Sequence, residues 1–449
     1  MRRVVIALVV IAWVAASAAA ETIKKIVVED NTKTTADTVI FISQLEEGDE
    51  WNPTMVDLVK ERLVSSGLFK DVEVYWTPKD GGVVVHILAK DKHSWVIAPA
   101  FYNQPTNVGG GVGFGENNLF GQNQKLLLYA QVATGDSFFI GAWVIPSIGG
   151  TRLYAQLDTY LKSARNFEYN APTSYLVKDA IHPVRESRLL YLNGGARLGW
   201  EFIRGVKLDT RIRGARVSYS DLKVDEEALA TDFEDGIRPN NGTVLPPGTE
   251  GWDVSNETNL SFDNRANWYG VQTGHRYRFT FEHALPSLGS DFIYWLAKFN
   301  AFKAIKIFDR HNFVAKLDVG YGRNLPFQQE FTTGGTSMRG YLNDEFRGNL
   351  RGLANLEYSF PVFTIAGFGV RGLAFWDSAY TTFTATSTNE DRNYLANAKV
   401  RELDGFKNSV GVGTRFYLRQ IVLPLLGLDF GYGLEARDFQ IYLAIGLTD

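Results

Sequence analysis

The sequence predicts a transmembrane β-barrel of about sixteen antiparallel strands, preceded by one small α+β domain. Three observations predict it. Apolar and polar residues alternate through most of the chain after residue 92. Most of the alternating stretches have ten or more residues, the length that a tilted strand needs to cross a bilayer. Short and long connections also alternate along the chain, as they do between the two rims of a bacterial membrane barrel.

The composition excludes several classes of protein. The 449 residues include 46 lysines and arginines and 50 aspartates and glutamates, so no basic surface for nucleic acid is indicated. Cysteine is absent, which excludes disulfides, thiolate metal sites and a lipid-modified N-terminal cysteine. Aromatic residues make up 13% of the chain, and 43 glycines stand against 14 prolines. This mixture suits strands and tight turns better than helices.

Residues 1–20 have the pattern of a secretory signal peptide. Arg2 and Arg3 give a positive start, Val4 to Val14 an apolar centre, and Ala18 to Ala20 a cleavage site. An uncleaved membrane anchor is the alternative, and the run of small residues argues against it. No later apolar run reaches the roughly 18 residues of a transmembrane helix. An exported chain of this kind is periplasmic, secreted or a barrel in the outer membrane.

Residues 21–92 are predicted to form a small domain in the order strand, helix, helix, strand, strand. The helical patterns cover 35–45 and the stretch from Asn52 to Gly67, and the strand patterns cover 22–28, 69–76 and 83–89. For the second helix we expect Asn52 as the N-cap, Pro53 as the first helical residue and Gly67 as the stop. The sequence Pro78-Lys79-Asp80-Gly81-Gly82 predicts a hairpin turn.

Residues 93–449 carry the strand patterns of the barrel. Thr151 to Leu161 is the clearest, with leucines on one face and polar residues on the other. A soluble sandwich would also alternate, so one strand decides nothing. The predicted strands are 95–103, 107–115, 122–133, 136–146, 151–162, 187–200, 204–219, 253–264, 273–285, 290–304, 311–323, 351–361, 367–377, 406–418, 423–433 and 438–447. The long connections 163–186, 220–252, 324–350 and 378–405 all fall on the same parity, and Glu226 to Glu250 is expected to be a solvated loop.

One long connection, Gly334 to Arg347, contains Arg339 between apolar residues and a glycine. Alternation places Glu357 on the luminal face of the next strand and Asp377 on the luminal face of the strand after it. A guanidinium that folds back into the lumen would bind these carboxylates through charge-assisted hydrogen bonds. The alternative is a set of unrelated surface charges, and alternation alone does not decide between the two.

Several short motifs resemble those of the BamA/TamA-type outer-membrane β-barrel assembly factors. Met338-Arg339-Gly340-Tyr341 is similar to the VRG(F/Y) signature of their sixth external loop, with Met338 in place of valine or isoleucine. Leu356-Glu357-Tyr358 and Phe375-Trp376-Asp377 resemble the two following strands, whose acidic residues hold the loop arginine. Gly115 to Gly121 resembles the first periplasmic turn, and Ser65 to Val72 the helix-to-strand junction of a POTRA domain.

The resemblance implies a protein that folds and inserts β-barrel proteins into the outer membrane without nucleotide. We expect the strands 95–103 and 438–447 to close the barrel with weak pairing, which Gly446 weakens further. An opened seam could then pair with an incoming strand. The POTRA-like domain would bind substrate at its sheet edge, and a spacer role is the alternative. Two features depart from the family: only one POTRA-like domain is present, and the chain ends in Thr448-Asp449 instead of an aromatic residue.

The expected partners are unfolded outer-membrane barrel proteins and outer-membrane lipid, with periplasmic chaperones or accessory lipoproteins as candidates and no nucleic acid. We expect the barrel in the cell outer membrane and the N-terminal domain in the periplasm. No cofactor and no enzymatic activity are expected, because no phosphate-binding Gly-x-x-x-x-Gly-Lys, no His-Glu-x-x-His and no Ser-His-Asp grouping is found; His275 and His283 are predicted to face lipid. The alternatives are a two-partner-type secretion pore, whose members carry two POTRA domains and a plug helix, and a passive porin.

Overall fold

The computed structural model describes residues 21–104, 107–169, 183–203, 205–224, 246–268, 270–365, 368–384, 405–418 and 424–445. The predicted signal peptide, Gly446, the C-terminal Thr448-Asp449 and most of the predicted loop 226–250 lie outside these ranges. The chain divides into two compact units. One holds the residues up to Ser94 together with Asn117–Asn123, and the other holds Trp95–Glu116 and the residues from Gln124 onward.

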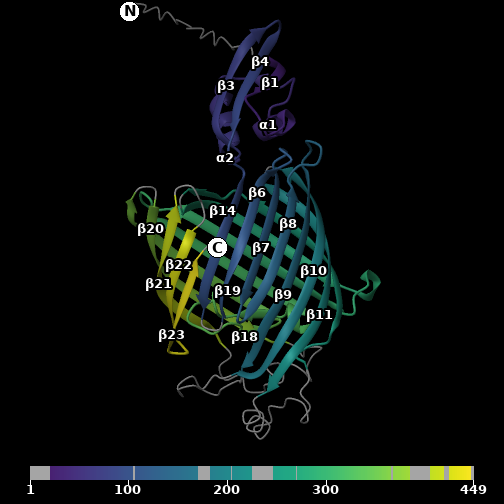
Figure 1. Cartoon of the computed structure of the whole chain (residues 1–449), viewed down its shortest axis with the longest axis vertical. Helices are drawn as coiled ribbons and strands as arrows, with labels where there is room; N and C mark the ends of the chain where they lie inside the picture. The colour runs from purple at the N-terminus through teal and green to yellow at the C-terminus, as the bar shows by residue number, and fades with distance from the viewer. Residues whose placement is uncertain are drawn as a thin grey trace, which may run out of the picture. The chain divides into compact units, whose positions relative to one another are not determined.

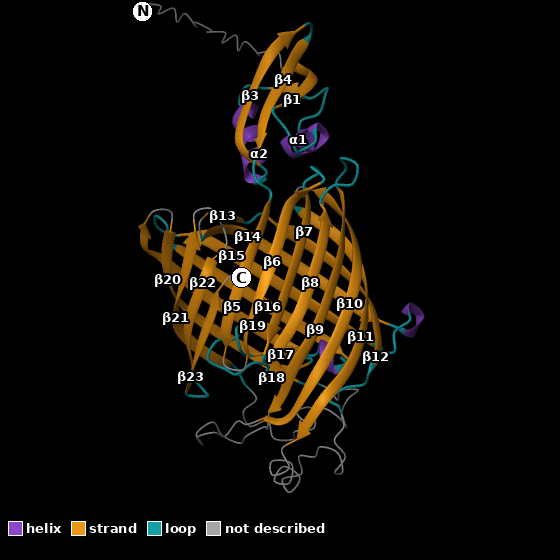
Figure 2. Ribbon diagram, viewed as in Figure 1, coloured by secondary structure: helices purple, strands orange, loops and turns teal. Residues whose placement is uncertain are grey.

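The first unit is a four-stranded sheet with two helices (Figure 2). Its sheet order is β2-β1-β4-β3, with β1 parallel to β4 and β3 antiparallel to β4. Val83, Val85 and Ile87, on alternate positions of β4, pack with isoleucines of β1 and with one face of each helix to form the core of this unit. The elements are β1 (Glu21–Glu29), α1 (Ala36–Ser43), β2 (Glu50–Trp51), α2 (Met55–Ser65), β3 (Phe69–Lys79) and β4 (Gly82–Asp91).

The start of α2 differs from the prediction. Asn52 and Pro53 lie in a turn that precedes the helix, and Thr54 occupies the N-cap position. Asn52 still receives a backbone hydrogen bond on its side chain, from the Thr54 N–H at 3.0 Å, and its carbonyl accepts from Met55 N–H at 2.8 Å. The Asn52 side chain therefore accepts the hydrogen bond expected of a cap, although the helix itself begins two residues later than predicted. Gly67 follows the helix with φ +73°, a left-handed conformation that suits glycine.

Asp91, at the end of β4, holds the loop between β1 and α1. Its carboxylate accepts hydrogen bonds from the backbone N–H groups of Thr32 and Lys33, both at 2.7 Å, and from the Thr34 hydroxyl. Burial alone would raise the pKa of Asp91, but these hydrogen bonds, led by the one from Lys33, hold it below the ordinary value of 3.8. The stabilisation from the charged form is present above that value and is lost as the pH falls through the lower folded-state pKa.

We expect Asp91→Asn to loosen this loop at neutral pH by about 1 kcal/mol, because a neutral amide accepts these hydrogen bonds less strongly. Tryptic cleavage after Lys33 in the full chain should become several-fold faster. Glu73→Gln, on the neighbouring strand β3, is the control. An unchanged cleavage rate in Asp91→Asn would show that the loop is held by its other contacts.

The second unit is a closed barrel (Figure 1). Its ring contains the sixteen strands that the sequence predicts and one three-residue strand, β13, in the turn before β14. The barrel strands are β5 (Trp95–Gln104), β6 (Asn107–Leu119), β7 (Gln124–Ala133), β8 (Asp136–Ile145), β9 (Leu153–Tyr169), β10 (Pro183–Ile203), β11 (Val206–Val224), β12 (Gly251–Asp263), β13 (Ala266–Trp268), β14 (Val271–Ala284), β15 (Tyr294–Lys306), β16 (Asn312–Arg323), β19 (Leu350–Ile365), β20 (Phe368–Thr382), β21 (Lys407–Leu418), β22 (Pro424–Gly433) and β23 (Asp438–Ile445).

The strand boundaries differ from the prediction in several places. The connection before β15 contains a short 3-10 helix, η1 (Pro286–Leu288), as well as residues 289–293. β15 begins at Tyr294 and not at 290, because Asp291 exchanges hydrogen bonds with Trp252 of β12, at 2.8 and 2.7 Å, instead of pairing in the ladder with β14. β9, β10 and β11 are longer than predicted, at 17, 21 and 19 residues. No helix among the described residues is long and apolar enough to cross a membrane.

The two faces of the barrel wall differ in polarity as the alternation predicts. Along β9, Leu153, Leu157 and Leu161 are exposed on the outside. Tyr277, Phe279 and Phe281 are exposed in the same way on β14, on the face of His275 and His283. The opposite, luminal face carries buried charged and polar side chains. An apolar exterior around a polar interior is the pattern of a barrel that spans a membrane.

Candidate functional site in the barrel lumen

The connection between β16 and β19 folds back against the luminal wall instead of standing away from the barrel. It contains the 3-10 helix η2 (Phe327–Gln329) and a two-stranded hairpin of β17 (Phe331–Thr333) and β18 (Phe346–Gly348). We call residues 324–349 the luminal loop. Its tip is buried: Met338 and Tyr341 are at most 1% exposed. The strands of this inner hairpin have three residues each, too few for the alternation to show them.

Arg339 lies at the tip and is held by carboxylates from three strands. Its Nε and Nη2 donate to the two oxygens of Asp377 on β20 at 2.9 and 2.8 Å. Its Nη1 lies 2.9 Å from Glu357 Oε1 on β19 and 3.4 Å from Asp429 Oδ2 on β22. The structure therefore brings Arg339 together with both acids that alternation selected. Asp377 is fully buried, and the side-by-side geometry of its two bonds is the bidentate form that guanidinium favours.

Asp429 is a third partner that the sequence reasoning missed. It also binds Arg415 of β21, whose Nη2 donates to Asp429 Oδ2 at 2.8 Å. Alternation along β22 does place Asp429 on the luminal face, but nothing local indicates that β22 lies beside the loop tip. That neighbourhood depends on how the barrel closes. The cluster thus contains two guanidinium groups and three carboxylates, a nearly balanced set of charges in which Arg339, Asp377 and Asp429 are buried.

Two further contacts fix the orientation of the guanidinium. Its central carbon lies 3.4 Å from the centre of the Phe375 ring, on the strand that carries Asp377. Asn355 Nδ2 donates to Asp377 Oδ1 at 2.9 Å and to the Ser337 carbonyl at 3.1 Å, which ties the loop to β19 and β20. Burial by itself lowers the pKa of Arg339, but Asp377, Glu357 and Asp429 raise it above the ordinary value. Arg339 is therefore a permanent cation, and a buried one that is well paired.

Gly340 brings the backbone of the tip against the backbone of β22. It has φ +96°, and a Cβ atom there would lie 2.6 Å from Gly433 N. A Cβ on Gly431 would lie 2.7 Å from Gly340 N, and one on Gly433 would lie 2.7 Å from Gly340 O. Both sides of this contact must therefore lack side chains. We call Gly340, Gly431 and Gly433 the glycine contact.

Gly340→Ala should displace the tip from β22, because the new methyl group meets backbone that cannot move aside. Left-handed strain and overpacking together should cost about 2–4 kcal/mol. The measurement is the urea concentration at which the folded, faster-migrating band is lost in unheated gels. Gly352→Ala is the matched control, since a Cβ at Gly352 on β19 meets no atom within 4 Å. Equal urea resistance of the two variants would contradict the close contact.

The tip also binds the last strand and the turn before it. The Tyr442 hydroxyl, on β23, accepts from Gly340 N at 3.0 Å and donates to the Tyr341 carbonyl at 3.0 Å. The Tyr341 hydroxyl donates to the carboxylate of Glu435. Glu435 is held in turn by the backbone N–H of Asn408 at 2.7 Å. Through Tyr442 the tip is therefore hydrogen-bonded to β23, which forms one side of the seam with β5.

The barrel closes between β5 and β23 through a short ladder. In the described residues this ladder has three residue pairs, Leu443↔Asn103, Ala444↔Tyr102 and Ile445↔Phe101. The neighbouring ladders are longer, with ten pairs between β5 and β6 and eight between β22 and β23. Gly446, expected to weaken this seam, lies outside the described residues. Among the described residues, the seam ladder therefore has fewer residue pairs than the ladders on either side of it.

The sequence match and the fold agree on the family. Residues 118–448, most of the chain, match the Omp85 superfamily domain. The chain belongs to the Omp85 superfamily. The Omp85 barrel is an outer-membrane barrel, and the resemblance to BamA/TamA-type proteins in the luminal loop and the following strands lies within the matched region. No functionally curated protein matches the sequence.

Solved structures of Omp85 type share the fold of this chain. BamA from Haemophilus ducreyi lacking POTRA domains 1–3 has a TM-score of 0.61 and 16% identity, over 95% of this chain and 84% of that one. CdiB from Acinetobacter baumannii has a TM-score of 0.63 and 12% identity, over 95% and 73%. CdiB from Escherichia coli has 0.64 and 13%, over 95% and 76%. At these identities the likeness shows the fold.

The luminal cluster of this Omp85 barrel consists of ion pairs between the loop tip and the wall. Arg339 and Asp377 are buried, and Glu357 and Arg415 are partly exposed. Within the described residues no group of three or more histidines, aspartates or glutamates is placed to hold a metal ion. What the arrangement can do is hold the loop tip against β19, β20, β22 and β23.

Proposed function

We propose that the protein folds and inserts β-barrel proteins into the outer membrane, by opening the seam between β5 and β23 and pairing an incoming strand with an exposed edge. The observation that carries this proposal is the seam ladder, which in the described residues has three pairs, beside ladders of ten and eight pairs. A shorter ladder needs less free energy to separate and to expose the backbone groups of a strand edge. No nucleotide is required for such an exchange of hydrogen bonds.

In this proposal the N-terminal unit is a periplasmic POTRA-like domain that receives the substrate. Its sheet ends on β3, an eleven-residue strand whose ladder in the described residues is with β4. An extended polypeptide could add to the other edge of β3 through backbone hydrogen bonds, which are independent of the side chains of the substrate. Such binding suits a protein that handles many unfolded chains.

The role proposed for Arg339, Glu357 and Asp377 is to brace the lumen while the seam opens. Met338 and Tyr341 pack beneath the tip with Leu353 and Ala379 from β19 and β20, so the brace has an apolar base as well as an ionic one. The tip contacts strands on the β23 side of the seam, and it would keep this side of the barrel in shape when β5 separates from it.

A two-partner-type secretion pore is the second candidate, favoured by the likeness in fold to the two CdiB structures. Depletion of the protein separates the candidates. An assembly factor should leave the cell with a reduced set of folded outer-membrane barrels, measured by quantitative proteomics of purified outer membranes. A secretion pore should leave those barrels at normal levels and remove one exported protein from the medium. Normal levels of every other barrel after depletion would contradict the assembly function.

A further inference from the structure

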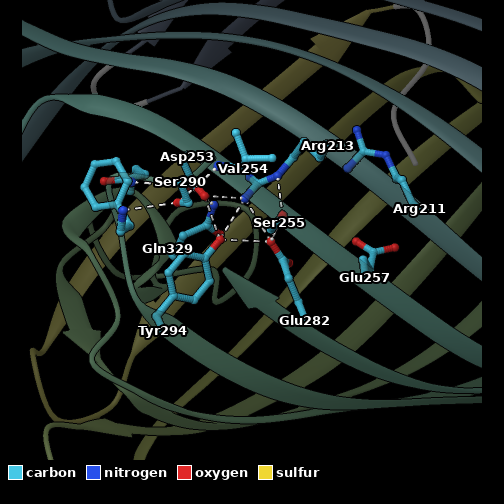
Figure 3. A network of polar contacts seen from close by, with 12 residues as sticks. Arg211, Arg213, Asp253, Val254, Ser255, Glu257, Glu282, Ser290, Tyr294 and Gln329 are labelled. Carbon is cyan, nitrogen blue, oxygen red and sulfur yellow. Dashed lines mark hydrogen bonds and ion pairs between the residues drawn. The ribbon is translucent and has the colours of Figure 1, made fainter. Parts of the chain in front are cut away.

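A second buried charge network lies on the wall formed by β10 to β15 (Figure 3). Its centre is Arg213 of β11, whose side chain is 7% exposed. The Arg213 Nη2 lies 3.0 Å from Asp253 Oδ1 on β12 and 2.9 Å from Glu282 Oε1 on β14. The same nitrogen donates to the Tyr294 hydroxyl of β15 at 2.7 Å, and Arg213 Nε donates to the Ser255 hydroxyl at 3.0 Å. One guanidinium therefore links four adjacent strands.

The luminal loop binds this network through its first turn. The side-chain amides of Gln328 and Gln329, at the end of η2, donate to Asp253 Oδ2 at 3.3 and 3.1 Å. Asp253 thus uses one oxygen for Arg213 and the other for the loop. Figure 3 shows Gln329 and Tyr294 converging on the Asp253 side of the network. Hydrogen bonds to a buried, fully paired carboxylate are among the stronger ones in proteins.

Packing around η2 supports the same attachment. The Phe327 ring, 1% exposed, meets the Tyr219 ring of β11 edge to face, with centroids 6.0 Å apart. Arg347 closes the other side: its central guanidinium carbon lies 3.7 Å from the Phe327 ring centre, and its Nη2 donates to the Phe327 carbonyl at 2.8 Å. The η2 turn is therefore enclosed between β11 and the second strand of the inner hairpin.

The two attachments of the loop are far apart around the ring. The stem of the loop, which contains η2, is bonded to β12 and packed on β11. The tip, around Arg339, is bonded to β19, β20, β22 and β23. Between β12 and β19 the ring order places β13, β14, β15 and β16. The loop itself leaves the wall at β16 and returns at β19. Its stem and its tip therefore bind different arcs of the barrel wall.

We propose that Asp253, held in place by Arg213, is a positioning residue that anchors the stem of the luminal loop. The loop is then a tether between the β11–β12 wall and the strands β22 and β23 on one side of the seam. The tether limits how far these strands move when the seam opens. The contact at Asp253 does not depend on the proposed assembly function. Only the importance of seam movement rests on that proposed function.

The test uses the full chain with Gln328→Ala and Gln329→Ala combined, since Arg213→Ala would leave Asp253 and Glu282 buried without a counter-ion. Asp253→Asn is a second variant, which leaves Glu282 to pair with Arg213. Gln156→Ala is the matched control, because the luminal Gln156 amide binds Asp158 on its own strand at 3.2 Å and does not touch the loop. Hydrogen–deuterium exchange reads out the amides of 325–333 and of 336–342 separately.

In the double glutamine variant we expect exchange over 325–333 to become about tenfold faster or more, with 336–342 unchanged and the folded gel band intact. Asp253→Asn should act in the same direction. Disulfide formation between Asn103→Cys and Leu443→Cys, a pair across the seam, should slow in the same background, because the released tether allows wider excursions. An exchange rate over 325–333 equal to that of the unmodified protein would contradict the role of Asp253 as an anchor. Faster exchange with an unchanged rate of disulfide formation would contradict the role of the loop as a tether. Neither measurement needs a substrate, so failure of the assembly function would be seen independently.

Discussion

Arg339→Ala is expected to destabilise the barrel by about 3–5 kcal/mol, because it leaves the fully buried Asp377 without its counter-ion. Asp377 is fully buried and loses two charge-assisted bonds at once, while Glu357 and Asp429 lose their shared donor. The measurement is the urea or temperature midpoint at which the folded, faster-migrating band disappears. In the proposed function the variant should also lose most of its barrel-assembly activity.

Two further variants make this expectation specific. Arg265→Ala is the matched control, since Arg265 forms an exposed ion pair with Asp263 and should change stability by less than about 1 kcal/mol. Exchanging the charges, with Arg339→Asp and Asp377→Arg together, should restore only part of the loss, because Glu357 and Asp429 would then face the new aspartate. A midpoint for Arg339→Ala equal to that of the control would show that the cluster does not support the barrel.

Locking the seam is expected to abolish assembly activity while leaving a fully folded barrel. The absence of native cysteine makes an introduced pair unique, and Asn103→Cys with Leu443→Cys lies in register across β5 and β23. Oxidation should block activity, and reduction should restore it. A disulfide fixes these strands against the separation that strand pairing with a substrate requires.

The matched control keeps the same cysteine on β23 and moves its partner. Leu428→Cys with Leu443→Cys joins β22 to β23, a ladder that the proposal does not open. This oxidised variant should retain activity. Full activity of the oxidised Asn103/Leu443 pair would sink lateral opening, and loss of activity in both pairs would point to general rigidity of the barrel as the cause.

The strands could be predicted because their signal is local. Successive side chains on a strand point alternately to lipid and to the lumen. The sixteen strands and the luminal positions of Glu357 and Asp377 can therefore be predicted from short stretches of sequence. The beginning of β15 is predicted four residues too early because Asp291 binds Trp252 of β12, a contact between distant parts of the chain that leaves no local pattern.

The rest of the site depends on contacts between distant parts of the chain. Asp429 and Tyr442 lie on the luminal face of strands that the sequence predicts, but their position beside the loop tip follows from closure of the barrel. The contact of the loop with Asp253 is harder still to predict from the sequence, because Gln328 and Gln329 belong to one short turn with no periodic pattern. The tip contains the family motif Met338-Arg339-Gly340-Tyr341, whereas no motif was recognised around Gln328 and Gln329 in the stem.

The glycine contact has a kinetic consequence. Gly340 meets Gly431 and Gly433 through backbone atoms, so no side chain of these residues has to find a rotamer when the tip reaches β22. The entropy lost when this contact forms is therefore that of the backbone alone, and glycine loses more backbone freedom than any other residue. Stiffening the chain around Gly340 when the tip is free would make its return to β22 faster, whereas a side chain at any of the three glycines would prevent it.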